Sequence, residues 1–265
     1  MLERWGSVPD GPVVASTVDA FGRIIALSAD GDLRVDGTSC SRVAEPGQFP
    51  KIDASGDGFV LVNSRCRIRP GFEAPRNGRI LDGAGQVLTA FHAGDGIEEL
   101  VTGPADEIWV SYFDEASIGD RYHPGLIRWT AAGEPVWWAI DDPVRLSWMD
   151  CYALNVGERR TWAVPYTEVP LVEVGGDGIR SVRRCPISRV RGVALSGAEA
   201  IFLTLAGQPG GYYHHLVPAR LTADEVVPEQ PVPLDVPDGG TLQRWVCRGD
   251  RMWLQFGDTW YVLGL

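Results

Sequence analysis

The chain has 265 residues, 45% of them hydrophobic, and a formal net charge of -11. This length and apolar content suit one large domain with a real core, so we predict a single domain over residues 1–265. The acidic balance excludes nucleic acid as a partner, because binding a phosphate backbone depends on clustered cations.

Seven short segments have the composition of β-strands, since they are rich in β-branched and aromatic residues and are bounded by Gly, Asp or Pro. Each of the first six follows a turn that closes an earlier strand. Their starts recur about every 35 to 55 residues, a period typical of propeller blades. In chain order the segments are RIIALS from Arg23, FVLVN from Phe59, EIWVSYF from Glu107, TWAVPY from Thr161, AIFLTL from Ala200, RMWLQF from Arg251 and TWYVLGL from Thr259.

This repeat predicts an all-β fold, a single β-propeller of six four-stranded blades. The third unit shows the four-stranded meander most fully, in IEELVTG, EIWVSYF, GLIRWTAAG and PVWWAI. The last unit has only three strands before the chain ends. We therefore expect LERWGSV at the N-terminus to supply its fourth strand and close the ring. The alternative is a two-sheet sandwich, which does not require the repeated unit.

The repeat and its aromatic-rich blades resemble the small six-bladed propellers of the strictosidine-synthase-like and gluconolactonase-like group. That resemblance implies a ring with a central channel. In strictosidine synthase a channel carboxylate moves protons in an amine–aldehyde condensation of the Pictet–Spengler type. The segments GDGI (94–97), YFDE (112–115) and DCYALN (150–155) are also similar to uncharacterised actinobacterial propeller proteins. This second resemblance implies a bacterial protein and no particular activity.

Polar residues lie at the ends of several predicted strands, and we expect them on one rim of the propeller. In this fold, the loops from second to third strands and the connections between blades lie on the same face. Asp150 begins a first strand beside the channel with no flanking Gly, so we predict it as the main acid–base group. Asp95 and Glu115 are the other catalytic candidates. The alternative for Asp95 is a turn cap, and for Asp114–Glu115 a solvated pair.

The predicted binding residues surround those carboxylates on the same rim. Exposed aromatic side chains at a concave mouth suit a ring-shaped ligand, and arginines orient an anionic group. The tryptophans inside strands are instead expected to fill the spaces between blades. The predicted substrate-binding residues are Trp148, Tyr122, Tyr212, Tyr213, His214, Arg191 and Arg244.

The sequence offers no clear metal or cofactor motif. Adjacent residues of a strand point to opposite faces, so His214 and His215 cannot readily hold one ion. The five cysteines are odd in number and include no C-x-x-C pair, which indicates a reducing compartment. We predict no cofactor and no resident metal, although rim carboxylates that converge in space would suit calcium.

Two functions from different classes remain open. The first is a cytoplasmic enzyme that acts on a small molecule in bacterial metabolism, specialised metabolism included. Its rim carboxylates are expected to perform acid–base catalysis of a condensation, lyase or cyclase step on an aromatic or anionic substrate. The alternative is a non-catalytic propeller that binds a protein or a regulatory ligand on its rim. No apolar run approaches the roughly 20 residues of a membrane span, so no membrane partner is expected.

Overall fold

The structure is a computed structural model that describes residues 2–66, 73–208, 211–237 and 240–265. It has the predicted β-propeller fold. The strands of the described residues form five sheets, and the largest of them, with eight strands, consists of two four-stranded meanders that meet at the parallel pair of β15 and β24. Each four-stranded meander is called a blade below. The seven segments predicted as strands are all strands, and the first six are the second strands of their blades.

Blades 1 to 3 follow one another from residue 13 to residue 138, each numbered from its first strand to its fourth. Blade 3 has a small additional strand, β12 (Arg121–Tyr122), which pairs with β11. The blades contain β2 (Val13–Val18), β3 (Ile24–Ser28), β4 (Asp32–Val35) and β5 (Thr38–Arg42); β6 (Lys51–Ser55), β7 (Gly58–Val62), β8 (Gly78–Leu81) and β9 (Val87–Phe91); and β10 (Asp95–Thr102), β11 (Ile108–Ile118), β13 (Leu126–Trp129) and β14 (Pro135–Trp138).

Blades 4 to 6 occupy the rest of the chain, and the last of them takes its fourth strand from the N-terminus. Blade 5 has an additional strand, β23 (Val232–Pro233), beside β21. The blades contain β15 (Asp150–Val156), β16 (Thr161–Tyr166), β17 (Leu171–Gly175) and β18 (Gly178–Arg183); β19 (Val190–Ser196), β20 (Glu199–Gln208), β21 (Gly211–Leu221) and β22 (Val226–Pro228); and β24 (Leu242–Arg248), β25 (Arg251–Phe256), β26 (Thr259–Gly264) and β1 (Glu3–Ser7).

The chain divides into two compact units, each with three blades. The amino-terminal unit is residues 7–150, and the carboxy-terminal unit is residues 1–6 with residues 151–265. Each unit is described by itself below. The single domain over residues 1–265 stays a prediction.

Apolar layers fill the space between successive blades of each unit. Blades 1 and 2 enclose one cluster around Ile25 and Leu61, and blades 2 and 3 enclose another. Blades 4 and 5 pack around Val164 and Phe202, and blades 5 and 6 around Leu254. The prediction that strand tryptophans fill these layers is confirmed for Trp129 and Trp162, which belong to these clusters, and Trp138 packs against the cluster of blades 2 and 3. Trp109 and Trp253 are also buried.

Buried polar side chains tie neighbouring blades together at their first strands. In the amino-terminal unit, Asp53 of β6 accepts a hydrogen bond from the backbone N–H of Thr102 at 2.8 Å. In the carboxy-terminal unit, Asn155 of β15 donates to the carbonyl oxygens of Val193 at 2.7 Å and Gly249 at 2.9 Å, and accepts from the N–H of Gly249 at 2.8 Å. One amide thus links blades 4, 5 and 6, and satisfies backbone groups that are costly to bury unpaired.

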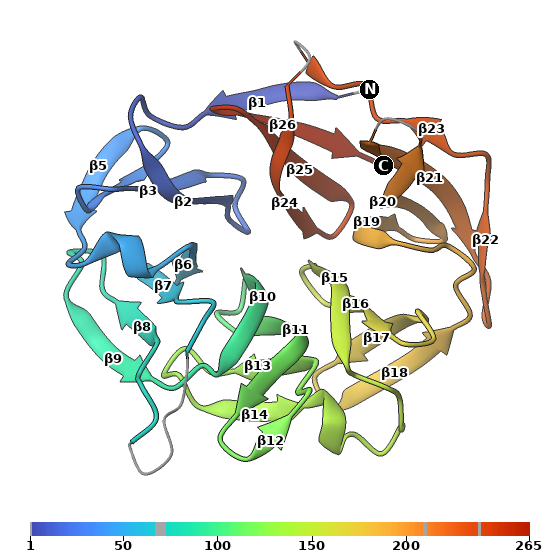
Figure 1. Cartoon of the computed structure of the whole chain (residues 1–265), viewed down its shortest axis with the longest axis horizontal. Helices are drawn as coiled ribbons and strands as arrows, with labels where there is room; N and C mark the ends of the chain where they lie inside the picture. Colours follow the sequence, from blue (N-terminus) through green and yellow to red (C-terminus); the bar gives the residue numbers. More distant parts are fainter. Residues whose placement is uncertain (1, 67–72, 209–210, 238–239) are drawn as a thin grey trace. The chain divides into compact units, whose positions relative to one another are not determined.

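The N-terminal strand β1 pairs with β26, as predicted (Figure 1). Its Trp5 ring lies 6.0 Å from the Trp253 ring, in an edge-to-face arrangement. The guanidinium of Arg251 lies 5.9 Å from the centre of the Trp5 ring. Blade 6 is therefore built from both ends of the chain.

No disulfide joins any two of the five cysteines, of which only Cys40 is exposed. None of the helices in the described residues has the length and apolar composition needed to cross a bilayer.

Candidate functional site

A pocket of about 250 Å³ opens between blades 4 and 5 of the carboxy-terminal unit. We call it the blade 4–5 pocket. It is built where the first and second strands of blade 4 meet the segment that leads into blade 5. Its lining residues are Tyr152, Tyr166, Val169, Ser188, Arg189, Val190 and Arg191.

Local backbone geometry places these side chains. Tyr152 belongs to β15, and Tyr166 is the last residue of β16. Two lining residues have left-handed backbone conformations, Val169 with φ 54° and Arg189 with φ 55°. A β-branched residue in this region is a genuine outlier, and such strain is concentrated at functional sites.

Two guanidinium groups supply all of the formal charge in the pocket lining, which contains Arg189 and Arg191 and no carboxylate. Arg191 is half-buried and forms no ion pair with any residue in the described ranges. Its Cζ lies 5.9 Å from the centre of the Tyr152 ring. The pocket is thus locally cationic in a chain whose net charge is -11.

The aromatic side of the pocket is a pair of tyrosines. The ring centres of Tyr152 and Tyr166 lie 5.4 Å apart, with 43° between their planes. Tyr166 is 37% exposed, so part of its ring surface faces solvent. The rings can therefore offer π surface to a ligand while Tyr152 also contacts the cation of Arg191.

Of the predicted binding residues, Arg191 lies in this pocket, and three others of the same unit do not line it. Burial lowers the pKa of His214 below its ordinary value, and Arg191 and His215 lower it further. Arg244 donates from Nη1 to Oε1 of Gln255 at 3.3 Å, and burial lowers the pKa of its guanidinium. Tyr213 is exposed on β21. The side chain of Tyr212 lies outside the described residues.

The amino-terminal unit brings Asp95 and Glu115 together on one arginine. Arg65 lies 3.5 Å from Oδ1 of Asp95 through Nε and 3.2 Å from Oε2 of Glu115 through Nη1. Oδ1 of Asp95 also accepts the backbone N–H of Cys66 at 2.6 Å. Asp95 therefore binds a backbone N–H that lies 29 residues before it in the chain and not in its own turn. Its catalytic role and its alternative role as a turn cap both stay predictions.

The sequence pattern predicts that Asp114 and Glu115 begin the loop after the strand EIWVSYF, and this prediction is wrong. Strand β11 runs through both residues to Ile118 and then pairs with β12, with Ser117 opposite Tyr122. The acidic pair does not end this strand because its hydrophobic neighbours Ala116 and Ile118 are buried in the core. Tyr122 is exposed on β12, as expected for a rim residue.

The predicted exposure of Trp148 is also wrong, because its side chain is only 3% exposed. It packs on Gly125, where an added Cβ atom would come within 2.5 Å of Trp148 Cβ. A glycine with φ 64° makes the space that the indole fills. Trp148 therefore acts in packing and does not present a stacking surface.

The thiol of Cys66 lies beside the imidazole of His92, with Sγ 3.7 Å from Nδ1. Burial and the charge of Asp95 raise the pKa of the Cys66 thiol to about 11. A nucleophilic cysteine needs a lowered pKa, so this pair does not resemble an activated thiolate.

Asp150 is the first residue of β15, as predicted. Alternate residues of a strand leave the same side, so Asp150 and Tyr152 share a side of β15. Tyr152, Val169 and Ser188 line the pocket but were not predicted as site residues. The alternation of side chains along the strand that begins at Asp150 is a sequence signal that would have identified Tyr152.

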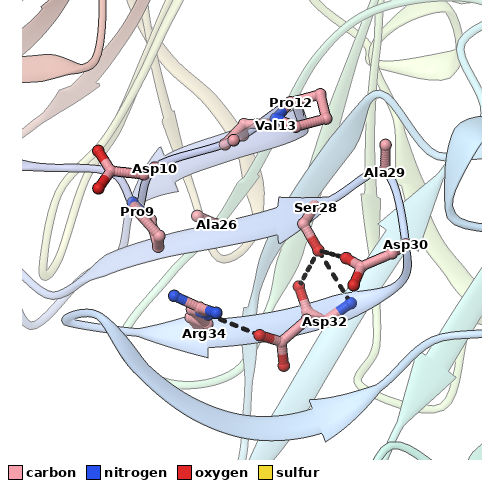
Figure 2. A pocket seen from close by; sticks show the side chains of 11 residues that line it. Pro9, Asp10, Pro12, Val13, Ala26, Ser28, Ala29, Asp30, Asp32 and Arg34 are labelled. Carbon is pink, nitrogen blue, oxygen red and sulfur yellow. Dashed lines mark hydrogen bonds and ion pairs between the residues drawn. The ribbon is translucent and has the colours of Figure 1, made fainter.

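A larger pocket of about 440 Å³ lies in the amino-terminal unit, between the loop before β2 and the turn from β3 to β4 (Figure 2). Two of its three aspartates, Asp30 and Asp32, are engaged locally. The Ser28 hydroxyl bonds Asp30 and thereby holds the pKa of that carboxyl below its ordinary value, and Nε of Arg34 donates to Asp32 at 2.6 Å. These carboxylates thus stabilise the turn from β3 to β4, so the blade 4–5 pocket is the better candidate for a functional site.

Within residues 2–66, 73–208, 211–237 and 240–265, no three His, Cys, Asp or Glu side chains are grouped so that they could hold a metal ion. The blade 4–5 pocket carries its positive charge on arginines instead.

No family model and no curated protein matches the sequence. Several solved structures match in fold. Hydrazine synthase of Kuenenia stuttgartiensis is 12% identical with a TM-score of 0.59, over 93% of this chain and 74% of that one. A chain of the mitotic checkpoint complex is 9% identical (TM-score 0.57, 96% and 76%), and Hsv2 of Kluyvelomyces marxianus is 11% identical (TM-score 0.56, 96% and 77%). At such identities the likeness concerns the fold alone.

Proposed function

We propose that this chain binds a small organic anion in the blade 4–5 pocket. The observation that carries the proposal is Arg191, which lines a pocket without a carboxylate and has no ion pair among the described residues, although acidic residues outnumber basic ones in the chain by 35 to 24. A cationic pocket on an acidic protein attracts anions locally while the remaining surface repels them.

Arg191 is the proposed anchor of the anion. Its guanidinium is a planar fork that matches a carboxylate in two parallel hydrogen bonds. Half-burial beside the Tyr152 ring weakens solvent screening, so a charge–charge contact is stronger there than on an open surface. Ser188 adds a hydroxyl that can donate one further hydrogen bond to the ligand.

Replacing this arginine tests the proposal. In Arg191→Gln we expect the affinity for small carboxylate and phosphate anions to fall by about ten- to a hundredfold, the scale of one charged hydrogen-bonding group. Isothermal titration calorimetry measures the change. Arg180→Gln, which removes the same charge from an exposed position on β18 of the same unit, is the control and should bind normally. Equal losses in both variants, or no anion binding by the unaltered protein, would contradict the proposal.

We further propose that Asp150 exchanges protons with a substrate, because it is a partly buried carboxylate at the start of the first strand of a blade. This role covers the condensation, lyase and cyclase steps predicted from the sequence. Asp150→Asn keeps the shape and removes the titratable group. On a substrate that the protein turns over, we expect about a hundredfold loss of kcat with little change in melting temperature. Normal turnover in a folded variant would reject the role, and poor folding would assign Asp150 to structure.

A further inference from the structure

The two tyrosines of the blade 4–5 pocket narrow the chemistry of its ligand. An anion alone requires only the arginines, yet one wall of the pocket is aromatic, with ring centres 5.4 Å apart. One side of Tyr152 is already occupied by the guanidinium of Arg191, at 5.9 Å. Tyr166, at 37% exposure, keeps ring surface that a ligand can contact.

The size of the pocket suits a small ligand. Its volume of about 250 Å³ lies below the range of roughly 300–1,000 Å³ that is typical of pockets for drug-sized molecules. A single six-membered ring with a short acidic substituent fits that space.

The donors favour a carboxylate over a phosphate. The lining includes the planar guanidinium of Arg191 and the hydroxyls of Ser188, Tyr152 and Tyr166, and it contains no glycine and no helix N-terminus, the backbone features on which many phosphate sites depend. A carboxylate presents two coplanar oxygens, which one guanidinium satisfies completely.

We propose that the ligand is a single-ring aromatic carboxylate, with its ring against Tyr166 and its carboxylate on Arg191. This inference rests on the proposed function and adds the class of ligand. It explains why the cation and the aromatic rings are adjacent. A ring substituted by a carboxylate brings its charge to Arg191 and its π surface to Tyr166 at the same time.

Calorimetric titration with matched probes tests the inference. Benzoate carries both features, cyclohexanecarboxylate keeps the charge but lacks the π system, and benzamide keeps the ring but lacks the charge. We expect benzoate to bind about three- to tenfold more tightly than cyclohexanecarboxylate, the scale of an aromatic pair. Benzamide should bind at least about tenfold more weakly than benzoate. Tyr166→Leu should erase the preference for benzoate over cyclohexanecarboxylate, and Val227→Ala, at an exposed hydrophobic residue of the same unit, should leave it intact.

The outcomes separate the two proposals. If both carboxylates bind equally and both depend on Arg191, the aromatic class is overturned and the anion site stands. If phenyl phosphate binds more than about tenfold tighter than benzoate, the carboxylate is overturned. If benzamide matches benzoate, or if no probe binds, the anion site itself is overturned.

Discussion

Asn155→Ala is expected to lower the free energy of unfolding by about 3 kcal/mol and the melting temperature by roughly 6–12 °C. The side chain is fully buried and makes three hydrogen bonds, two to Gly249 and one to Val193. Alanine leaves the carbonyl of Val193 and the N–H of Gly249 without this partner, whereas the carbonyl of Gly249 keeps a hydrogen bond from the N–H of Leu195. An unpaired buried group costs about 1–3 kcal/mol, so two of them account for an effect of about 3 kcal/mol.

Thermal unfolding followed by circular dichroism measures this change. Ser196→Ala, at an exposed position at the end of β19, is the control and should melt within about 1 °C of the unaltered protein. A small shift in Asn155→Ala, no larger than that of the control, would show that the three bonds contribute little.

The side-chain amide of Asn155 also links the stability of the fold to the candidate site. Asn155 lies toward the end of β15 and bonds Val193 of β19, while Tyr152 and Arg191 lie near the starts of those two strands. The spacing of the pocket walls therefore depends on how firmly β15 and β19 are joined. Asn155→Ala should weaken anion binding even at temperatures where the variant is folded, and Ser196→Ala should not.

The fold was predictable because strand signals recur with a regular period. Hydrophobic segments such as EIWVSYF and RMWLQF, each after a tight turn, are local features that one sequence shows directly. The pairing of β1 with β26 was predictable by counting strands, since blade 6 lacked its fourth. A repeat of this kind specifies which strands pair without any knowledge of side-chain contacts.

The site was predictable only in part, because exposure and approach depend on packing. Trp148 lies in a segment without strand pattern, and nothing in that segment shows that Gly125 makes room for its ring. Arg191 was predicted from its place on the rim, and it is the second residue of the first strand β19. Val169 was not, because a left-handed valine has no sequence signature. Sequence therefore predicts residues whose role follows from their place in the repeat. It does not predict residues whose role depends on backbone conformation or packing.

Deleting residues 1–8 is expected to lower the melting temperature by roughly 8–16 °C. The deletion removes β1 and exposes the edge of β26. It also removes Leu2, which packs on the core of blades 5 and 6, the Trp5 ring that contacts Trp253, and the buried Val8. Together these contacts amount to about 4 kcal/mol, from burial of two aliphatic side chains and one aromatic pair.

Val8→Ala separates the contribution of Val8 from that of β1, because it removes part of the core contact of Val8 and leaves β1 in place. We expect this variant to lose only about 1–2 kcal/mol, or roughly 2–8 °C. If the deletion melts at the same temperature as Val8→Ala, the strand adds nothing and the prediction of ring closure by the N-terminus loses its support.

A peptide supplied in trans gives the sharper test. Most side chains of β1 are exposed, so much of its effect must come from pairing with β26 and from the Trp5 contact. A synthetic peptide of residues 1–8 should therefore bind the deleted protein by adding a strand to the open edge and should raise its melting temperature in a concentration-dependent way. The same peptide with alanine in place of Trp5 should restore less, and a scrambled peptide should restore nothing. Equal restoration by all three would mean that the edge of β26 accepts any extended chain, and that the N-terminal sequence is not what specifies the last blade.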